Sequence, residues 1–194
     1  MKKNLLIVLS GPAGSGKTTL CANTIKCDPK FDRVITATTR APRAGEVDGK
    51  DYIFLSREEF LNKLQNGEFY EHATVHGRMY GTLKSSIQKA FADNKDLFLV
   101  IDVQGAKTWR EIAKKDPIIG NSLLSVFIMP KSIDELVSRL HNRNTDDEAE
   151  IALRMKTAQE ELKFAKDFDK ILHSGTREED LKSLLEIIAQ ARKG

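Results

Sequence analysis

The segment Gly11-Pro-Ala-Gly-Ser-Gly-Lys-Thr18 constrains the fold more than any other part of the chain. It matches the pattern GxxxxGK[ST] in full, follows the apolar run Leu5–Leu9 and precedes a stretch that can open a helix. Glycines let backbone N–H groups turn inward around phosphate oxygens, and the helix N-terminus adds the positive end of its dipole. The sequence therefore predicts a strand, a phosphate-binding loop and a helix, with a nucleoside triphosphate as the ligand.

Two side chains in this loop have the chemistry that phosphate transfer needs. Lys17 can reach the β- and γ-phosphates, and the hydroxyl of Thr18 can ligate Mg²⁺. A chance glycine-rich turn would also contain glycines, but it would lack the complete motif between a strand and a helix. The loop alone leaves the acceptor of the phosphate open.

Short apolar runs alternate with helix-period stretches along most of the chain. This alternation predicts a parallel, doubly wound α/β core. The expected strands are Leu5–Leu9, Val34–Thr38, Leu97–Asp102, Leu124–Met129 and Lys170–His173. Capping boxes, in which a hydroxyl and a Glu three residues later satisfy free N–H groups, predict helix starts. The candidates are Ser56…Glu59, Ser132…Glu135, Thr145…Glu148 and Thr176…Glu179.

Two segments break the alternation. Residues 36–82 contain turn signals and short strand-like pieces at Tyr52–Leu55 and Phe69–Val75, which predicts a small β-rich insertion. Residues 139–154 are polar and carry arginines but few large apolar side chains, which favours a mobile flap over a core element.

Composition excludes several classes of protein. A length of 194 residues favours one domain, and 31 basic against 28 acidic residues gives a net charge of +3, too balanced for a general nucleic-acid or membrane-surface binder. Cys21 and Cys27 fit neither a zinc site nor a disulfide framework. No apolar run is long enough for a membrane span or a signal peptide, so we expect a cytoplasmic protein.

The insertion carries a second group of residues suited to binding a phosphorylated acceptor. Arg40 and Arg43 can form a fork for an anion, and Tyr52 adds a hydroxyl donor. A carboxylate such as Glu71 can accept paired hydrogen bonds from guanine, which adenine does not offer. Taken singly, the arginines suit a solvated turn and Glu71 a surface carboxylate, so the interpretation depends on their combination.

These motifs together resemble the guanylate kinases over essentially the whole chain. The resemblance rests on GPAGSGKTT, TTRAPRAGEVDGKDY, Glu71 with Tyr80-Gly-Thr82, Ile101-Asp-Val-Gln-Gly and the later arginines. It implies a P-loop kinase with a three-layer α/β fold, phosphorylation of GMP by ATP with Mg²⁺, and a monomer or small homo-oligomer. It also implies one domain, residues 1–194, with a core of 1–35, 83–135 and 156–194, a GMP-binding region of 36–82 and a lid of 136–155.

The resemblance also implies a role for individual residues. Those expected to bind ATP are Gly11, Pro12, Ala13, Gly14, Ser15, Gly16, Lys17, Thr18, Thr19, Arg139 and Ser174. Those expected to bind GMP are Thr36, Arg40, Arg43, Tyr52, Glu71, Tyr80, Thr82 and Asp102. Those expected to act on the transferring phosphoryl group are Lys17, Arg43, Arg143 and Arg154, with Thr18 on the metal.

The chain departs from the family pattern in a few places. Thr36 and Thr82 stand where Ser is frequent, and Asn144 where Gly is frequent. Ser174-Gly175 replaces the usual Asn-Asp near adenine, so the side-chain contact to that base is open. Two alternatives also remain: a kinase of the same fold with another phosphorylated acceptor, and a non-catalytic module that binds proteins.

Overall fold

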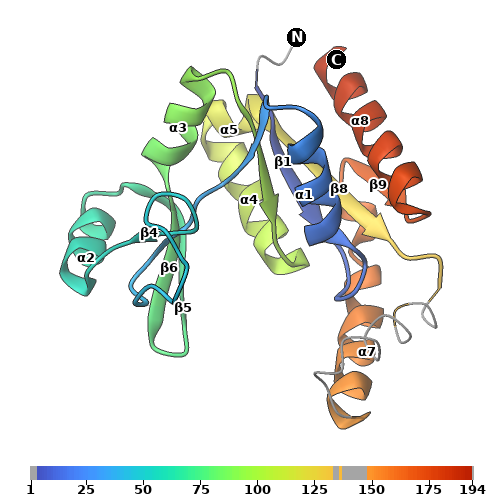
Figure 1. Ribbon diagram of the computed structural model, residues 1–194, viewed down its shortest axis with the longest axis horizontal. Helices are drawn as coiled ribbons and strands as arrows, with labels where there is room; N and C mark the ends of the chain where they lie inside the picture. Colours follow the sequence, from blue (N-terminus) through green and yellow to red (C-terminus); the bar gives the residue numbers. More distant parts are fainter. Residues whose placement is uncertain (1–3, 133–135, 137–147, 194) are drawn as a thin grey trace.

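The structure is a computed structural model that describes residues 4–132, 136 and 148–193. Figure 1 shows a central sheet with helices on both sides and a second, smaller sheet set to one side of it. The described elements are β1 (Leu6–Ser10), α1 (Lys17–Cys27), β2 (Phe31–Arg33), β3 (Ala37–Thr38), β4 (Ile53–Phe54), α2 (Arg57–Gln65), β5 (Phe69–Val75), β6 (Arg78–Leu83), α3 (Lys84–Ala92), β7 (Asp96–Val100), α4 (Val103–Lys115), α5 (Pro117–Ser122), β8 (Leu123–Met129), α7 (Glu148–Leu162), the 3₁₀ turn η1 (Ala165–Asp167), β9 (Lys170–His173) and α8 (Arg177–Lys193).

The central sheet is parallel, with the strand order β2-β7-β1-β8-β9. Its middle strand, β1, is buried along its whole length, as expected where helices cover both faces of a parallel sheet. The parallel α/β core predicted from the sequence is confirmed. Because β1 and β7 are neighbours, the phosphate loop after β1 and the residues after β7 leave the same edge of the sheet.

Alternate residues of β1 contact opposite layers. Ile7 and Leu9, with Leu5 just before the strand, join a core with α1 and α8, while Leu6 and Val8 join one with α3, α4 and α5. Such alternation follows from the two-residue period of a strand. In Figure 1, α1 and α8 lie on one side of the sheet and α3, α4 and α5 on the other, which makes three layers.

The second sheet has the order β4-β3-β6-β5 and joins β5 and β6 as an antiparallel hairpin. Helix α2 packs on it through Phe60 and Phe69, whose ring centroids are 4.4 Å apart. This small core, separate from the two cores of the central sheet, also includes Ala37, Met79 and Leu83. The expected β-rich insertion is confirmed.

The prediction of one core strand at Val34–Thr38 is wrong. Strand β2 lies earlier, at Phe31–Arg33, and pairs with β7 in the central sheet. The backbone N–H of Val34 makes a last bond to β7, and Ala37–Thr38 then pairs with β4 and β6 in the second sheet. The chain therefore passes from one sheet to the other within this run, and residues 34–36 belong to neither strand.

Local helix signals agree with the structure where residues are described. Ser56 and Glu59 form a complete capping box at α2, and Thr176 and Glu179 exchange the same pair of bonds at α8. The candidate at Ser132 depends on Glu135, which lies outside the described residues, as do Thr145 and residues 137–147 of the expected lid. Within the described ranges, no helix has the length and apolar character that a membrane span requires.

Candidate active site

The loop between β1 and α1 has the backbone conformation of an anion cradle. Gly11, Gly14 and Gly16 have φ values of 139°, 84° and 92°, all in the range that favours glycine. At Gly11 a side chain is also excluded by space, since a Cβ would lie 2.6 Å from the backbone oxygen of Ile128. Glycine is therefore required at Gly11 both for conformation and for the contact with β8.

The start of α1 leaves its first N–H groups without a side-chain cap. Gly16 is the N-cap residue, and no acidic side chain lies in the first turn. Uncapped N–H groups together with the helix dipole attract a negative group. The Ser15 hydroxyl is 1% exposed and has no hydrogen-bond partner among the described residues, so it adds a polar atom inside the loop.

The side chains expected to act on phosphate lie at this helix start. The ammonium of Lys17 donates to the backbone oxygens of Gly11 and Pro12, at 2.6 and 2.8 Å. Thr18 and Thr19 lie on the first turn of α1, and both are exposed. The structure thus brings the predicted phosphate-loop residues together around one helix N-terminus.

Glu161 lies close enough to both Lys17 and Asp102 to interact with their charges. Asp102 follows β7 and caps α4 by accepting from the N–H of Gly105 at 2.7 Å. Glu161 comes from α7; burial raises its pKa, the charge of Lys17 lowers it and that of Asp102 raises it, and the net direction is upward. Nothing in the sequence suggested Glu161, because α7 reaches the phosphate loop only through the tertiary fold.

The remaining residues expected around ATP are described to different extents. Ser174 is 3% exposed, and its hydroxyl donates to Asp180 at 3.2 Å. Arg139 and Arg143 lie outside the described residues, and Arg154 belongs to α7 although its side chain is not described. Their expected roles stay predictions.

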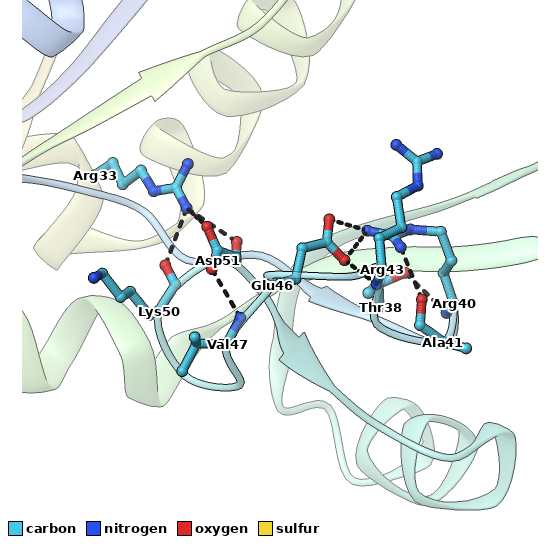
Figure 2. Close-up of polar contacts among 9 residues, drawn as sticks. All are labelled: Arg33, Thr38, Arg40, Ala41, Arg43, Glu46, Val47, Lys50 and Asp51. Carbon is cyan, nitrogen blue, oxygen red and sulfur yellow. Dashed lines mark hydrogen bonds and ion pairs between the residues drawn. The ribbon is translucent and has the colours of Figure 1, made fainter.

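The loop at residues 40–46 brings the two expected phosphate-binding arginines to one carboxylate, as Figure 2 shows. Arg40 Nη2 donates to both oxygens of Glu46, at 2.7 and 2.9 Å, and the backbone N–H of Arg43 donates to Oε2 at 2.7 Å. These hydrogen bonds, from Arg40 first and from Arg43 second, hold the pKa of Glu46 below its usual value. In Figure 2, the guanidinium of Arg43 points away from Glu46 and makes no contact with the other residues drawn.

The expected tyrosines lie beside this loop. The guanidinium carbon of Arg40 lies 5.2 Å from the centre of the Tyr52 ring, and the rings of Tyr52 and Tyr80 meet edge-on at 6.3 Å. Cationic and aromatic groups attract one another in this geometry. Arg40, Tyr52 and Tyr80 therefore form one cluster at the edge of the second sheet.

Glu71 and Thr82 face each other across the β5–β6 hairpin. The hydroxyl of Thr82, which is fully buried, donates to Oε1 of Glu71 at 2.7 Å. This bond fixes the carboxylate and leaves acceptor capacity on its other oxygen. The structure thus joins the two residues whose combination the sequence suggested for guanine.

A pocket of about 490 Å³ lies between the core and the insertion. It joins Thr18 and Cys21 of α1 with Thr36, Asp51 and Tyr52 of the insertion. Glu71, Tyr80 and Thr82 lie outside its lining, so the pocket does not enclose the pair expected to bind guanine.

The donor set near the phosphate loop suits Mg²⁺ held mainly by a nucleotide. In the part of the chain that the structure describes, no three His, Cys, Asp or Glu side chains form a metal-binding group. Mg²⁺ usually keeps several waters and binds through substrate phosphates with one or two protein oxygens. The hydroxyl of Thr18 at the helix start fits this mode.

The fold and the site define a class: an α/β nucleotide kinase with a phosphate loop after β1 and a separate β-rich insertion. The chain belongs to the guanylate kinase family, whose sequence profile it matches over residues 3–191. The family predicted from the motifs is confirmed.

Individual proteins are similar over most of their length. The guanylate kinase of Clostridioides difficile (strain 630) is 41% identical over 169 residues, covering 87% of this chain and 79% of the relative. That of Cereibacter sphaeroides is 39% identical over 187 residues, covering 95% and 86%. The crystal structure of guanylate kinase from Anaplasma phagocytophilum aligns with a TM-score of 0.66 at 30% identity, covering 98% and 87%.

Proposed function

We propose that the protein transfers the γ-phosphoryl group of ATP to GMP, giving ADP and GDP. Membership of the guanylate kinase family supports this reaction, and the relatives carry that name at 39–41% identity. The structural observation that carries the choice of acceptor is Glu71, held by Thr82 at 2.7 Å next to the arginine and tyrosine cluster. Neither a different acceptor nor a non-catalytic module gains support from the comparisons.

On the donor side, the backbone of residues 11–19 binds the ATP phosphates. Lys17 exchanges its bonds to the Gly11 and Pro12 oxygens for bonds to phosphate, and Thr18 ligates Mg²⁺ together with phosphate oxygens. The metal supplies charge neutralisation for the transferring group. Arg139, Arg143 and Arg154 approach that group from the lid and α7, and Ser174 lies near adenine.

On the acceptor side, Arg40, Arg43, Tyr52 and Tyr80 bind the phosphate of GMP. Glu71 accepts from the guanine N1–H and 2-amino group, while Thr36, Thr82 and Asp102 complete that pocket. The protein has little covalent chemistry to perform, since phosphoryl transfer depends on positioning two anions and on stabilising their charge. The donor subsite thus lies after β1 of the central sheet, and the acceptor subsite combines residues of the insertion with Asp102, which follows β7.

A coupled assay of ADP formation tests the proposal. Purified protein with Mg²⁺ and ATP is given GMP, AMP, CMP or UMP in turn, and excess EDTA serves as the metal-free control. Turnover with GMP that exceeds the other three by roughly two orders of magnitude or more is expected, with loss of activity in EDTA. Equal use of AMP, or no turnover with any nucleotide, would contradict the assignment.

A further inference from the structure

We propose that Glu46 is a positioning residue for the acceptor phosphate, which it serves by holding Arg40 and the Arg40–Arg43 loop in one arrangement. This role rests on the proposed function of Arg40 and Arg43 as GMP phosphate ligands. Glu46 itself does not touch the phosphate; it acts through the arginines.

The backbone brings Glu46 to this place. Its N–H donates to the oxygen of Arg43 at 3.0 Å and closes a tight turn. Gly45, at the third position of that turn, has φ +86°, which glycine adopts without strain and other residues do not. The turn therefore returns the carboxylate toward the residues that precede it.

Both carboxylate oxygens are then used. Oε1 accepts from Arg40, while Oε2 accepts from Arg40 and from the N–H of Arg43 (Figure 2). One side chain thus links the guanidinium of the first arginine to the backbone of the second. A charged pair with several short hydrogen bonds holds its geometry better than a single contact.

The environment of Arg40 strengthens this restraint. The side chains of Arg40 and Glu46 are only 15% and 20% exposed. Arg40 Nη1 also donates to the backbone oxygen of Ala41 at 2.8 Å, and the guanidinium lies over Tyr52. Glu46 is the carboxylate that closes this set of contacts, so its removal releases the arginine on one side.

Two physical effects of Glu46 on GMP binding oppose each other. A carboxylate near the site repels the phosphate dianion, which would weaken binding; a fixed guanidinium loses less conformational freedom on binding, which strengthens it. We expect the second effect to dominate, because hydrogen bonds from Arg40 and Arg43 compensate the charge of Glu46. Removing that charge should therefore weaken GMP binding.

The test compares Glu46→Gln with a matched control, Glu68→Gln. Glu68 also lies in the insertion and pairs with a lysine, Lys63, at 2.9 Å, but it contacts no arginine of the proposed site that the structure describes. We expect Glu46→Gln to raise the KM for GMP about tenfold while kcat and the KM for ATP change by less than about threefold. Glu68→Gln should leave all three constants unchanged. Thermal melting of each variant checks that the fold is retained.

A double-mutant cycle with Arg40→Ala identifies the route of the effect. If Glu46 acts through Arg40, Glu46→Gln should change the KM for GMP by less than about twofold in the Arg40→Ala background. A KM that falls or stays unchanged in Glu46→Gln, or an equal rise in both backgrounds, would overturn the positioning role alone. An Arg40→Ala variant with the wild-type KM for GMP would instead remove the proposed phosphate role of Arg40, and the role of Glu46 with it.

Discussion

The two loops proposed to bind phosphate, the phosphate loop at residues 11–18 and the arginine loop at residues 40–46, offer different kinds of group. The first offers backbone N–H groups in a glycine-dependent conformation, and the ammonium of Lys17 donates hydrogen bonds to the loop's own carbonyl oxygens. The second uses side-chain cations, one of them held by the carboxylate of Glu46. Backbone dipoles are fixed once the loop folds, whereas long side chains need partners to hold them. The difference predicts that the two loops respond differently to mutation.

The largest effect is expected in the phosphate loop. Lys17→Ala removes the cation nearest the β- and γ-phosphates, so we expect kcat to fall on the order of 10²–10³-fold. The fold should survive, because water can replace the ammonium at the loop oxygens that it contacts. Steady-state kinetics and thermal melting measure both effects, and Lys182→Ala, on the exposed side of α8, is the control. Wild-type turnover in Lys17→Ala would contradict the proposed role of Lys17 at the ATP phosphates.

The next effect belongs to the acceptor side. Glu71→Ala leaves the guanine N–H donors unpaired, and we expect kcat/KM for GMP to fall on the order of 10²-fold. The KM for ATP should stay near the wild-type value, because Glu71 lies in the second sheet, away from the phosphate loop. A Glu71→Ala variant that uses GMP normally, or that loses ATP binding equally, would contradict the proposed division into two subsites.

Glycine substitutions in the two loops sharpen the comparison at the level of stability. Gly11→Ala places a methyl 2.6 Å from the backbone oxygen of Ile128, and we expect a loss of about 3 kcal/mol or more. Gly45 has a positive φ, but a methyl added there would have no neighbouring atom within 4 Å, so Gly45→Ala should cost only about 1 kcal/mol. Chemical denaturation of both variants measures the difference. Equal losses would mean that the close contact with β8 is not what requires glycine at Gly11.

The smallest effect on activity is expected from modifying the cysteines, whose two thiols should differ in how fast they react. Burial raises the pKa of the Cys21 thiol to about 11, while Cys27 is exposed. A thiol with that pKa is ionised to only about one part in a thousand near pH 8, so it should react with a disulfide reagent far more slowly than Cys27. Because burial favours the neutral thiol of Cys21, its slow reaction should persist at neutral pH and be lost as the pH rises toward 11. Two fast-reacting thiols near pH 8 would show that α1 opens behind the phosphate loop; Cys27→Ser identifies the fast phase.

Several parts of the fold and site were predictable because their signals are local. The glycines and Lys17 of the phosphate loop, the capping box at Ser56 and the strand Lys170–His173 appear in the structure where the sequence placed them. Each depends on the preferences of a few neighbouring residues. The association of Glu71 with Thr82 was anticipated from the family resemblance, and the β5–β6 hairpin brings the two residues into contact.

Other parts required the assembled chain. The run Val34–Thr38 was predicted as one strand, but its division between two sheets depends on strands that are distant in sequence, such as β7 and β6. Glu161 approaches Lys17 only because α7 packs beside the phosphate loop. Glu46 follows Arg43 closely in the sequence, yet its hydrogen bonds depend on the turn at Gly45 and on the placement of Arg40 over Tyr52.

The sequence by itself determined which chemical groups the proposed site contains: a glycine-rich loop, a pair of arginines and a carboxylate. These follow from residue types and short spacings, which act within a few residues of the chain. Only the tertiary structure decided which groups restrain one another, including Glu46 on Arg40 and Thr82 on Glu71. A hydrogen bond between side chains requires donor and acceptor to be placed to within a few tenths of an ångström, and those positions are set when the two sheets and their helices pack.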